Sequence, residues 1–196
     1  MSEQTDKSTQ RREATERRRS LSAEQRTNAS LAIAETVKGL PSFQRARQIA
    51  LYLPTDCEVN TWPLAHSAWR MRKRIFAPIV RKTGNLRFCE LTTKSKLVHN
   101  KYGIAEPSAG DSIDPKRLDV VLLPLVAFDS NAYRLGWGGG YFDRTFAFAN
   151  LRHLYSKPKL IGLGFACQEL PTVVRDAWDI PLFQIVTESS VVTRER

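Results

Sequence analysis

The chain has little of what marks secreted and membrane proteins. Its three cysteines lie far apart in the 196 residues and match no zinc-binding or redox spacing. We therefore expect no disulfide bonds and a cytoplasmic location. No apolar run approaches the ~18 residues that span a bilayer, and the polar first residues lack the apolar core of a signal peptide. We expect no membrane partner.

Several common catalytic and nucleotide-binding motifs are also missing. The sequence contains no GxxxxGK[ST] P-loop and no GxGxxG fingerprint that opens a first βα unit. It has no nucleophile elbow, and His66, His99 and His153 lie in no recognisable catalytic constellation. These absences favour catalysis by positioning and electrostatics over catalysis through a covalent enzyme intermediate.

Positive charge is concentrated in one segment. The formal net charge is +10, and the segment from Arg70 to Lys101 holds ten basic residues against one acid, Glu90. Such a field attracts polyanions. The alternative is a solvated face that keeps the protein in solution.

Hydrophobic patterning predicts an α/β fold in a single domain that covers residues 1–196. The sequence SAEQ from Ser22 to Gln25 fits a capping box at the start of a helix, and Gly39 followed by Pro41 ends that helix. Strands alternate with helices, which is typical of an α/β sandwich with a largely parallel sheet. We expect strands at 48–53, 74–80, 86–91, 118–123, 160–166 and 185–187, and helices at 3–20, 22–39, from 61 onward, and at 141–150.

The most informative segment runs from Pro124 to Arg144, directly after an apolar strand. Four of the five residues from Gly136 to Gly140 are glycine. Backbone N–H groups of such a loop, ahead of a helix, can face phosphate oxygens. Arg134 can add bidentate contacts, and Asp143 is a hard oxygen ligand suited to Mg²⁺. The alternative is a tight turn in which the glycines relieve steric crowding.

This segment resembles the signature of the 5-formyltetrahydrofolate cyclo-ligase (methenyltetrahydrofolate synthetase) family, P-x-x-x-F-D-x-x-x-x-R-L-G-x-G-x-G-Y-Y-D. Further matches follow in the family's order: K-x-x-x-R at Lys7 and Arg11, a glutamate-bearing loop at 53–58, G-I-x-E-P at 103–107, and WDIPL around Asp179. The signature residues present are Pro124, Phe128, Asp129, Arg134, Leu135, Gly136, Gly138, Gly140, Tyr141, Phe142 and Asp143.

The resemblance implies a three-layer α/β/α sandwich and an ATP-dependent enzyme. The implied reaction closes 5-formyltetrahydrofolate to 5,10-methenyltetrahydrofolate, with release of ADP and phosphate. In the implied mechanism the formyl oxygen attacks the γ-phosphate of ATP, N10 of the folate attacks the resulting iminium phosphate, and phosphate leaves. No protein nucleophile is needed, which agrees with the absence of one in the sequence.

The resemblance also implies roles for individual residues. Arg134 and Tyr141 are the expected catalytic residues, Asp143 is the expected Mg²⁺ ligand, and Glu58 is expected to hydrogen-bond the pterin. The residues expected at the co-substrate ATP are Lys7, Arg11, Arg134, Leu135, Gly136, Trp137, Gly138, Gly139, Gly140, Tyr141 and Phe142. Those expected at the folate are Leu53, Glu58, Trp137, Gly138, Gly139, Gly140 and Tyr141.

The chain departs from the family pattern at four positions. Some members carry a basic residue where this chain has Trp137 and a lysine where it has Gly139, so positive charge near the phosphates is reduced. Trp137 can instead stack on an aromatic ring of folate or adenine. Phe183 stands where some members have a second acidic metal ligand, and Phe142 replaces a tyrosine.

The expected partners are ATP and 5-formyltetrahydrofolate, with or without a polyglutamate tail. We expect a monomer that binds no nucleic acid. The basic segment is a candidate for binding an anionic polyglutamate tail, through Arg72, Lys73 and Arg74 among others. Two alternatives stay open: a non-catalytic folate-binding or regulatory member of the same fold, and a basic nucleic-acid-binding protein.

Overall fold

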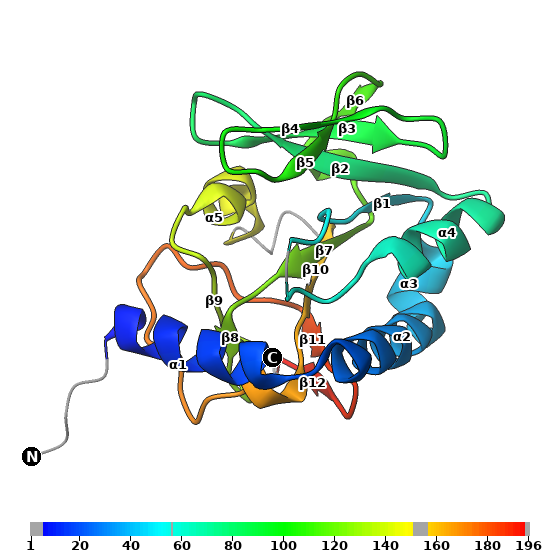
Figure 1. Cartoon of the computed structure of the whole chain (residues 1–196). Coiled ribbons are helices and arrows are strands. Elements are labelled where there is room, and N and C mark those ends of the chain that lie inside the picture. Colours follow the sequence, from blue (N-terminus) through cyan, green and yellow to red (C-terminus); the bar gives the residue numbers. More distant parts are fainter. Residues whose placement is uncertain (1–5, 56, 151–156, 195–196) are drawn as a thin grey trace, which may run out of the picture.

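The computed structural model describes residues 6–55, 57–150 and 157–194 and is built around one mixed sheet (Figure 1). From edge to edge, its eight strands are β12 (Val191–Thr193), β11 (Gln184–Val186), β10 (Lys159–Leu163), β7 (Val120–Pro124), β1 (Gln48–Ala50), β2 (Arg74–Val80), β3 (Leu86–Leu91) and β6 (Ser112–Ile113). The strands from β11 to β2 run parallel, and β12, β3 and β6 pair antiparallel at the edges. The predicted largely parallel sheet is therefore confirmed.

Helices cover one face of this sheet more fully than the other. On one side lie α2 (Ala23–Gly39), α3 (Pro41–Arg45) and α4 (Trp62–Arg70), and on the other lies the short α5 (Tyr141–Thr145) (Figure 1). The described residues also form the helix α1 (Lys7–Ser20) and the 3₁₀ turns η1 (Pro115–Arg117), η2 (Ala147–Asn150) and η3 (Ala166–Gln168). Two small antiparallel strand pairs complete the fold: β4 (Leu97–His99) with β5 (Ala105–Pro107), and β8 (Ala127–Phe128) with β9 (Arg134–Leu135). No helix among the described residues has the length and apolar character to span a membrane.

The central strands bury side chains on both faces because successive residues point to opposite sides of a sheet. In β7, Val120 and Leu122 belong to the core under α2–α4, whereas Val121 and Leu123 belong to the core on the opposite face. A strand buried on both faces reads as a continuous apolar run. The sequence VVLL therefore marks the middle of the sheet.

The expected start of α2 is confirmed in detail. The backbone N–H of Gln25 donates to Ser22 Oγ at 3.1 Å, and the N–H of Ser22 donates to Gln25 Oε1 at 2.7 Å, which completes the capping box. The helix buries Ile33, Ala34 and Val37 against the sheet. Its end at Gly39 also agrees with the prediction.

Other predicted boundaries were only partly right. The strands at 74–80 and 86–91 are confirmed, but the strand expected at 48–53 ends at Ala50, and the buried residues that follow lead into a loop. The helix expected at 141–150 ends at Thr145 and continues as η2, with the buried Phe146 between them packed 5.7 Å from the Phe88 ring. The short strands β4, β5, β6, β8, β9 and β12 were not predicted.

Candidate functional site

A cavity of about 660 Å³ opens beyond the carboxyl ends of β1, β2 and β7. This is the edge at which parallel α/β sheets commonly bind ligands. Every residue predicted for the site lines this one cavity: Lys7, Arg11, Leu53, Glu58, Arg134, Leu135, Gly136, Trp137, Gly138, Gly139, Gly140, Tyr141, Phe142 and Asp143. The residues predicted for the site therefore share one cavity, and the function of that cavity and the role of each residue stay predictions.

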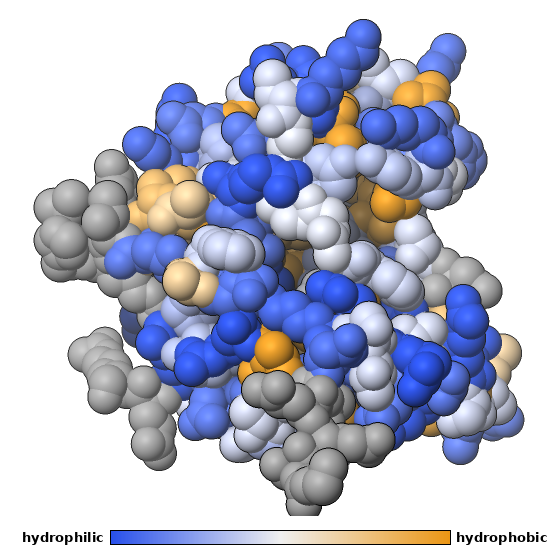
Figure 2. All heavy atoms as spheres, turned by 90° about the vertical axis from the view of Figure 1, so that its left-hand side faces the viewer, coloured by the Kyte–Doolittle hydropathy of each residue, from blue (hydrophilic) through white to orange (hydrophobic). Residues whose placement is uncertain are grey.

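The molecular face that carries α1 and α5 is mainly hydrophilic, with hydrophobic residues confined to small patches (Figure 2). The cavity itself has a different character at its two ends. Cationic side chains enter from α1 and β9, whereas Leu53, Trp137 and other apolar residues line the part beside the loop that follows β1. A charged ligand group and a flat apolar one can thus be held side by side.

The glycine loop between β9 and α5 contains two left-handed residues. Gly138 has a φ of 97° and Gly140 a φ of 63°, a region that other residues enter only with strain. Gly140 is also the N-cap of α5. A side chain at Gly138 would point at the guanidinium of Arg11, 3.5 Å away. The glycines therefore let the backbone turn sharply while a cation stays close.

Arg134 and Asp143 form an ion pair inside the cavity. Arg134 Nη2 donates to Asp143 Oδ1 at 2.7 Å, and Nη1 donates to the carbonyl of Ile180 at 3.0 Å. The Arg134 side chain is 5% exposed and that of Asp143 is 22% exposed. The guanidinium is thus fixed from two sides, with its remaining donors available to an anion.

Lys7 connects α1 to the C-terminal loop. Its Nζ lies 2.7 Å from Asp176 Oδ2 and 2.7 Å from Asp179 Oδ2. Partial burial alone would lower the pKa of Lys7, but the two carboxylates outweigh burial and raise it. Lys7 therefore stays protonated throughout the neutral pH range.

Two further hydrogen bonds hold α1 and the β1 loop against the glycine loop. Arg11 Nε donates to the carbonyl of Gly136 at 2.8 Å. Trp137 Nε1 donates to Glu58 Oε1 at 3.0 Å, while the N–H of Thr55 donates to Glu58 Oε2 at 2.9 Å. Segments far apart in sequence are therefore joined around the cavity.

Sequence reasoning missed two parts of the cavity wall. Tyr102, next to the β4–β5 pair, shares a 2.7 Å hydrogen bond with the hydroxyl of Tyr141 and closes the side opposite α1. This bond, with help from the nearby Lys101, lowers the pKa of Tyr102. The same bond raises the pKa of Tyr141, against the opposing effect of Lys101. Asp176 was also missed. Only its place two residues before Trp178 in the DAWDIPL stretch connects it with the family motif.

The carboxylates of the cavity fit a metal held jointly with a ligand. The described residues contain no group of three or more His, Cys, Asp or Glu side chains placed to hold an ion by themselves. Mg²⁺ commonly uses one or two carboxylates plus substrate phosphates. Asp143 Oδ1 accepts from Arg134 and from the N–H of Ile180, and Oδ2 accepts from no described residue. Phe183 packs under Lys159 and does not line the cavity.

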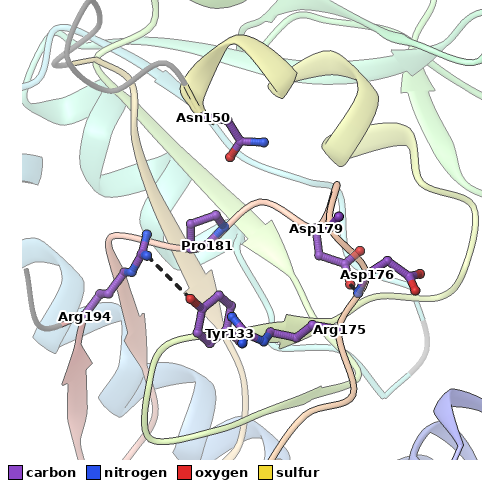
Figure 3. Close-up of a pocket in the computed structure, with 8 residues that line it drawn as sticks. Tyr133, Asn150, Arg175, Asp176, Asp179, Pro181 and Arg194 are labelled. Carbon is purple, nitrogen blue, oxygen red and sulfur yellow. Dashed lines mark hydrogen bonds between the residues drawn. The ribbon is translucent and has the colours of Figure 1, made fainter.

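A second, smaller cavity of about 390 Å³ shares Asp176 and Asp179 with the first (Figure 3). Arg175 stacks 3.8 Å from the centre of the Tyr133 ring, and Arg194 Nη2 donates to the Tyr133 hydroxyl at 3.5 Å. None of the residues predicted for the site lines this cavity. The larger cavity is therefore the candidate active site.

The basic segment is not a single patch facing the cavity. Lys73 Nζ donates to the carbonyls of Gln44 and Ala46, and Arg74 pairs with Glu90, at the end of β2 away from the cavity. The idea that Arg72, Lys73 and Arg74 contact a ligand tail was wrong in this respect. Lys101, which lies 4.9 Å from the ring of Tyr102, is the basic residue of the segment beside the cavity wall.

Comparisons with known proteins agree on one family. A protein-family model described as the 5-formyltetrahydrofolate cyclo-ligase family matches residues 3–188. The chain is 37% identical over 180 residues to the 5-formyltetrahydrofolate cyclo-ligase of Escherichia coli K12, which covers 90% of this chain and 97% of the relative. It is 32% identical over 174 residues to that of Haemophilus influenzae, with 86% and 90% covered.

Solved structures give the same result. The structure of Aquifex aeolicus 5,10-methenyltetrahydrofolate synthetase superposes with a TM-score of 0.83 at 32% identity, and the match covers 97% of this chain and 93% of that one. A 5,10-methenyltetrahydrofolate synthetase from Mycoplasma pneumoniae gives a TM-score of 0.73 at 25% identity, with 93% and 99% covered.

Proposed function

This chain belongs to the 5-formyltetrahydrofolate cyclo-ligase family, and from that membership we propose that its large cavity is where ATP and 5-formyltetrahydrofolate react. The products are 5,10-methenyltetrahydrofolate, ADP and phosphate. One observation carries the proposal: a single cavity at the carboxyl edge of the sheet gathers the glycine loop, the cations of α1 and β9, and Glu58.

The cationic end is suited to the triphosphate. Lys7 and Arg11 enter this end from α1 and Arg134 enters from β9, and each is held by a protein hydrogen bond or ion pair. Charged groups fixed before the ligand arrives need not reorganise as charge moves during reaction. Arg134 is the group we place at the transferred phosphoryl, and Tyr141 beside it contacts both substrates.

The opposite end is suited to the folate. Leu53 and Trp137 offer apolar surface to a flat ring, and Glu58 can accept hydrogen bonds from ring N–H groups. The formyl oxygen then faces the phosphates, which allows it to attack the γ-phosphorus, and N10 closes the ring as phosphate departs. The protein's contribution is to position two substrates and stabilise charge.

Asp143 is the residue we propose for Mg²⁺, because its Oδ2 has no protein partner among the described residues and the aspartate lines the cavity. The ion would neutralise phosphate charge when ATP is bound. Asp176 and Asp179 lie in the same wall, and both pair with Lys7. We therefore assign them the role of holding Lys7.

A tail of glutamates would leave the folate end near Lys101 and Tyr102, which stand at that wall. Replacing Lys101 with methionine should weaken binding of a polyglutamylated substrate more than that of the monoglutamate. Equal weakening would contradict this part of the proposal. We further propose a cytoplasmic enzyme, for which the three free cysteines are the support, and a monomer.

The test is a near-UV absorbance assay for the methenyl product with purified protein, Mg²⁺, ATP and 5-formyltetrahydrofolate. We expect an ATP-dependent rise that disappears in Arg134→Ala and persists in Arg19→Ala, an exposed arginine of α1. Binding of 5-formyltetrahydrofolate without any ATP-dependent product would instead support a non-catalytic folate-binding protein.

A further inference from the structure

Arg18 is a buried arginine whose guanidinium contacts an aromatic ring but has no hydrogen bond or ion pair with the described residues. It lies in α1 with 2% of its surface exposed, and its Nε is buried without a hydrogen-bond partner. Its terminal nitrogens also make no hydrogen bond or ion pair with residues 6–55, 57–150 or 157–194. The other arginines around the site are held: Arg11 by Gly136 and Arg134 by Asp143.

A buried guanidinium without a hydrogen bond or ion pair destabilises the folded state, so its presence requires an explanation. Burial lowers the pKa of Arg18, and the largest opposing influence is the carboxylate of Glu58. An arginine nevertheless keeps its charge in a protein. Buried polar groups of native proteins are almost always hydrogen-bonded, and exceptions often belong to binding or catalytic sites. If Arg18 served only to hold α1 in place, an apolar side chain would do so at lower cost.

The position of Arg18 indicates what it serves. Its guanidinium carbon lies 4.9 Å from the centre of the Trp137 ring, and Trp137 in turn donates to Glu58. Trp137 lines the large cavity, and Arg18 contacts the Trp137 ring without lining the cavity itself. Trp137 is 52% exposed, so its ring can turn toward solvent if the hydrogen bond from its single indole N–H to Glu58 is broken.

We propose that Arg18 is a specificity-determining residue for the folate ring, an inference that rests on the proposed function. The ring of a folate presents an amine, a ring N–H and a carbonyl oxygen along one edge. Glu58 can accept hydrogen bonds from the first two groups and cannot serve the third. Arg18, beside Glu58, donates to the carbonyl oxygen once the Trp137 ring turns toward solvent.

The decisive experiment changes the protein and the ligand together. Calorimetry without ATP compares 5-formyltetrahydrofolate with its 4-amino-4-deoxy counterpart, which replaces the ring carbonyl by an amine and also removes the adjacent ring N–H, so the contribution of Arg18 is measured as the difference in preference between the wild type and the variant. The wild-type chain should bind the carbonyl compound roughly 10- to 100-fold more tightly, the range of a hydrogen bond to a charged group. In Arg18→Met this preference should fall by about tenfold or more, the size of a hydrogen bond to a charged group, while the exposed Arg19→Met should keep it.

A purely structural role would give other results. If Arg18→Met weakens both ligands equally, or if it fails to fold or melts several degrees lower than the wild type, the inference is overturned. We expect the ligand-free variant to melt at an equal or higher temperature, because a buried unpaired charge has been removed. Failure of the wild type to form methenyl product would instead contradict the proposed function. The absorbance assay and the calorimetry therefore test the enzyme activity and the role of Arg18 separately.

Discussion

The guanidinium of Arg134 holds the carboxylate of Asp143 at 2.7 Å inside the cavity, and this pair lies next to the glycine loop. The two residues were expected to serve phosphate and metal separately. Because they are in contact, each residue can exchange its partner for a ligand without moving out of the cavity. A triphosphate oxygen can replace the carboxylate on Arg134, and Asp143 is then available to a cation.

Asp143→Asn keeps the shape of the side chain and its contact with Arg134 but removes the charge. We expect turnover to fall by about a hundredfold or more, the usual cost of losing one positioned electrostatic group. The melting temperature should change by only a few degrees, because the amide oxygen still accepts from Arg134. Steady-state rates and thermal melts measure both. Glu16→Gln on the exposed face of α1 is the control, and undiminished turnover in Asp143→Asn would remove its proposed metal role.

Lys7→Met tests whether α1 supplies charge to the nucleotide. We expect the KM for ATP to rise by about tenfold or more, the size of one charged hydrogen bond, while the KM for the folate changes little. Lys38→Met, which removes a surface pair with Glu35 on α2, should leave both values unchanged. A matching rise in both KM values would show that Lys7 maintains the whole cavity rather than the nucleotide end.

Local sequence patterns predicted what depends on neighbours along the chain. The capping box at Ser22, the apolar run of β7 and the glycine loop all have short-range causes, and each was located correctly. The parallel sheet followed because alternating strands and helices can pack in few ways. The fourteen predicted site residues share one cavity for the same reason, since loops after parallel strands meet at one edge.

Contacts between distant segments could not be predicted in this way. Lys7 meets Asp176 across 169 residues, and Tyr102 meets Tyr141 across 39. The sequence around each of these residues gives no indication of its distant partner. The burial of Arg18 could not be predicted either. Three consecutive arginines, Arg17–Arg19, are typical of a solvent-exposed charged run, and only the packing of α1 against the protein buries the middle one. The short edge strands were missed because two or three residues show no periodicity.

Gly140→Ala should strain the loop. The residue has a φ of 63°, and a new Cβ would lie 2.6 Å from Arg144 Nη1, in a side chain already bound to the carbonyls of Gly139 and Gly84. We expect a loss of about 1–2 kcal/mol in the free energy of unfolding, measured by urea titration. Gly136→Ala is the matched control, because nothing lies within 4 Å of its added Cβ. Equal losses in the two variants would show that backbone conformation is not the cause.

Asp119 ties β1 to β7 outside the active site and predicts a pH-dependent stability. Its Oδ2 accepts from the N–H groups of Arg47 and Gln48 at 2.8 and 3.0 Å, and Oδ1 lies 2.5 Å from Lys157 Nζ. Partial burial alone would raise the pKa of Asp119, but the bonds from Lys157 and the two N–H groups outweigh burial and lower it. The native state therefore binds its proton less readily than the unfolded chain does.

The sign of the effect follows from that difference. The contribution of Asp119 is fully present above the unfolded pKa of about 3.9 and is lost as the pH falls through the lower folded pKa. Asp119→Asn should therefore cost about 1–3 kcal/mol in the free energy of unfolding at neutral pH and much less near pH 3. Urea titrations at both pH values give the difference, with the exposed Glu24→Gln as control. A cost that stays the same at both pH values would mean that the Asp119 hydrogen bonds do not depend on its charge.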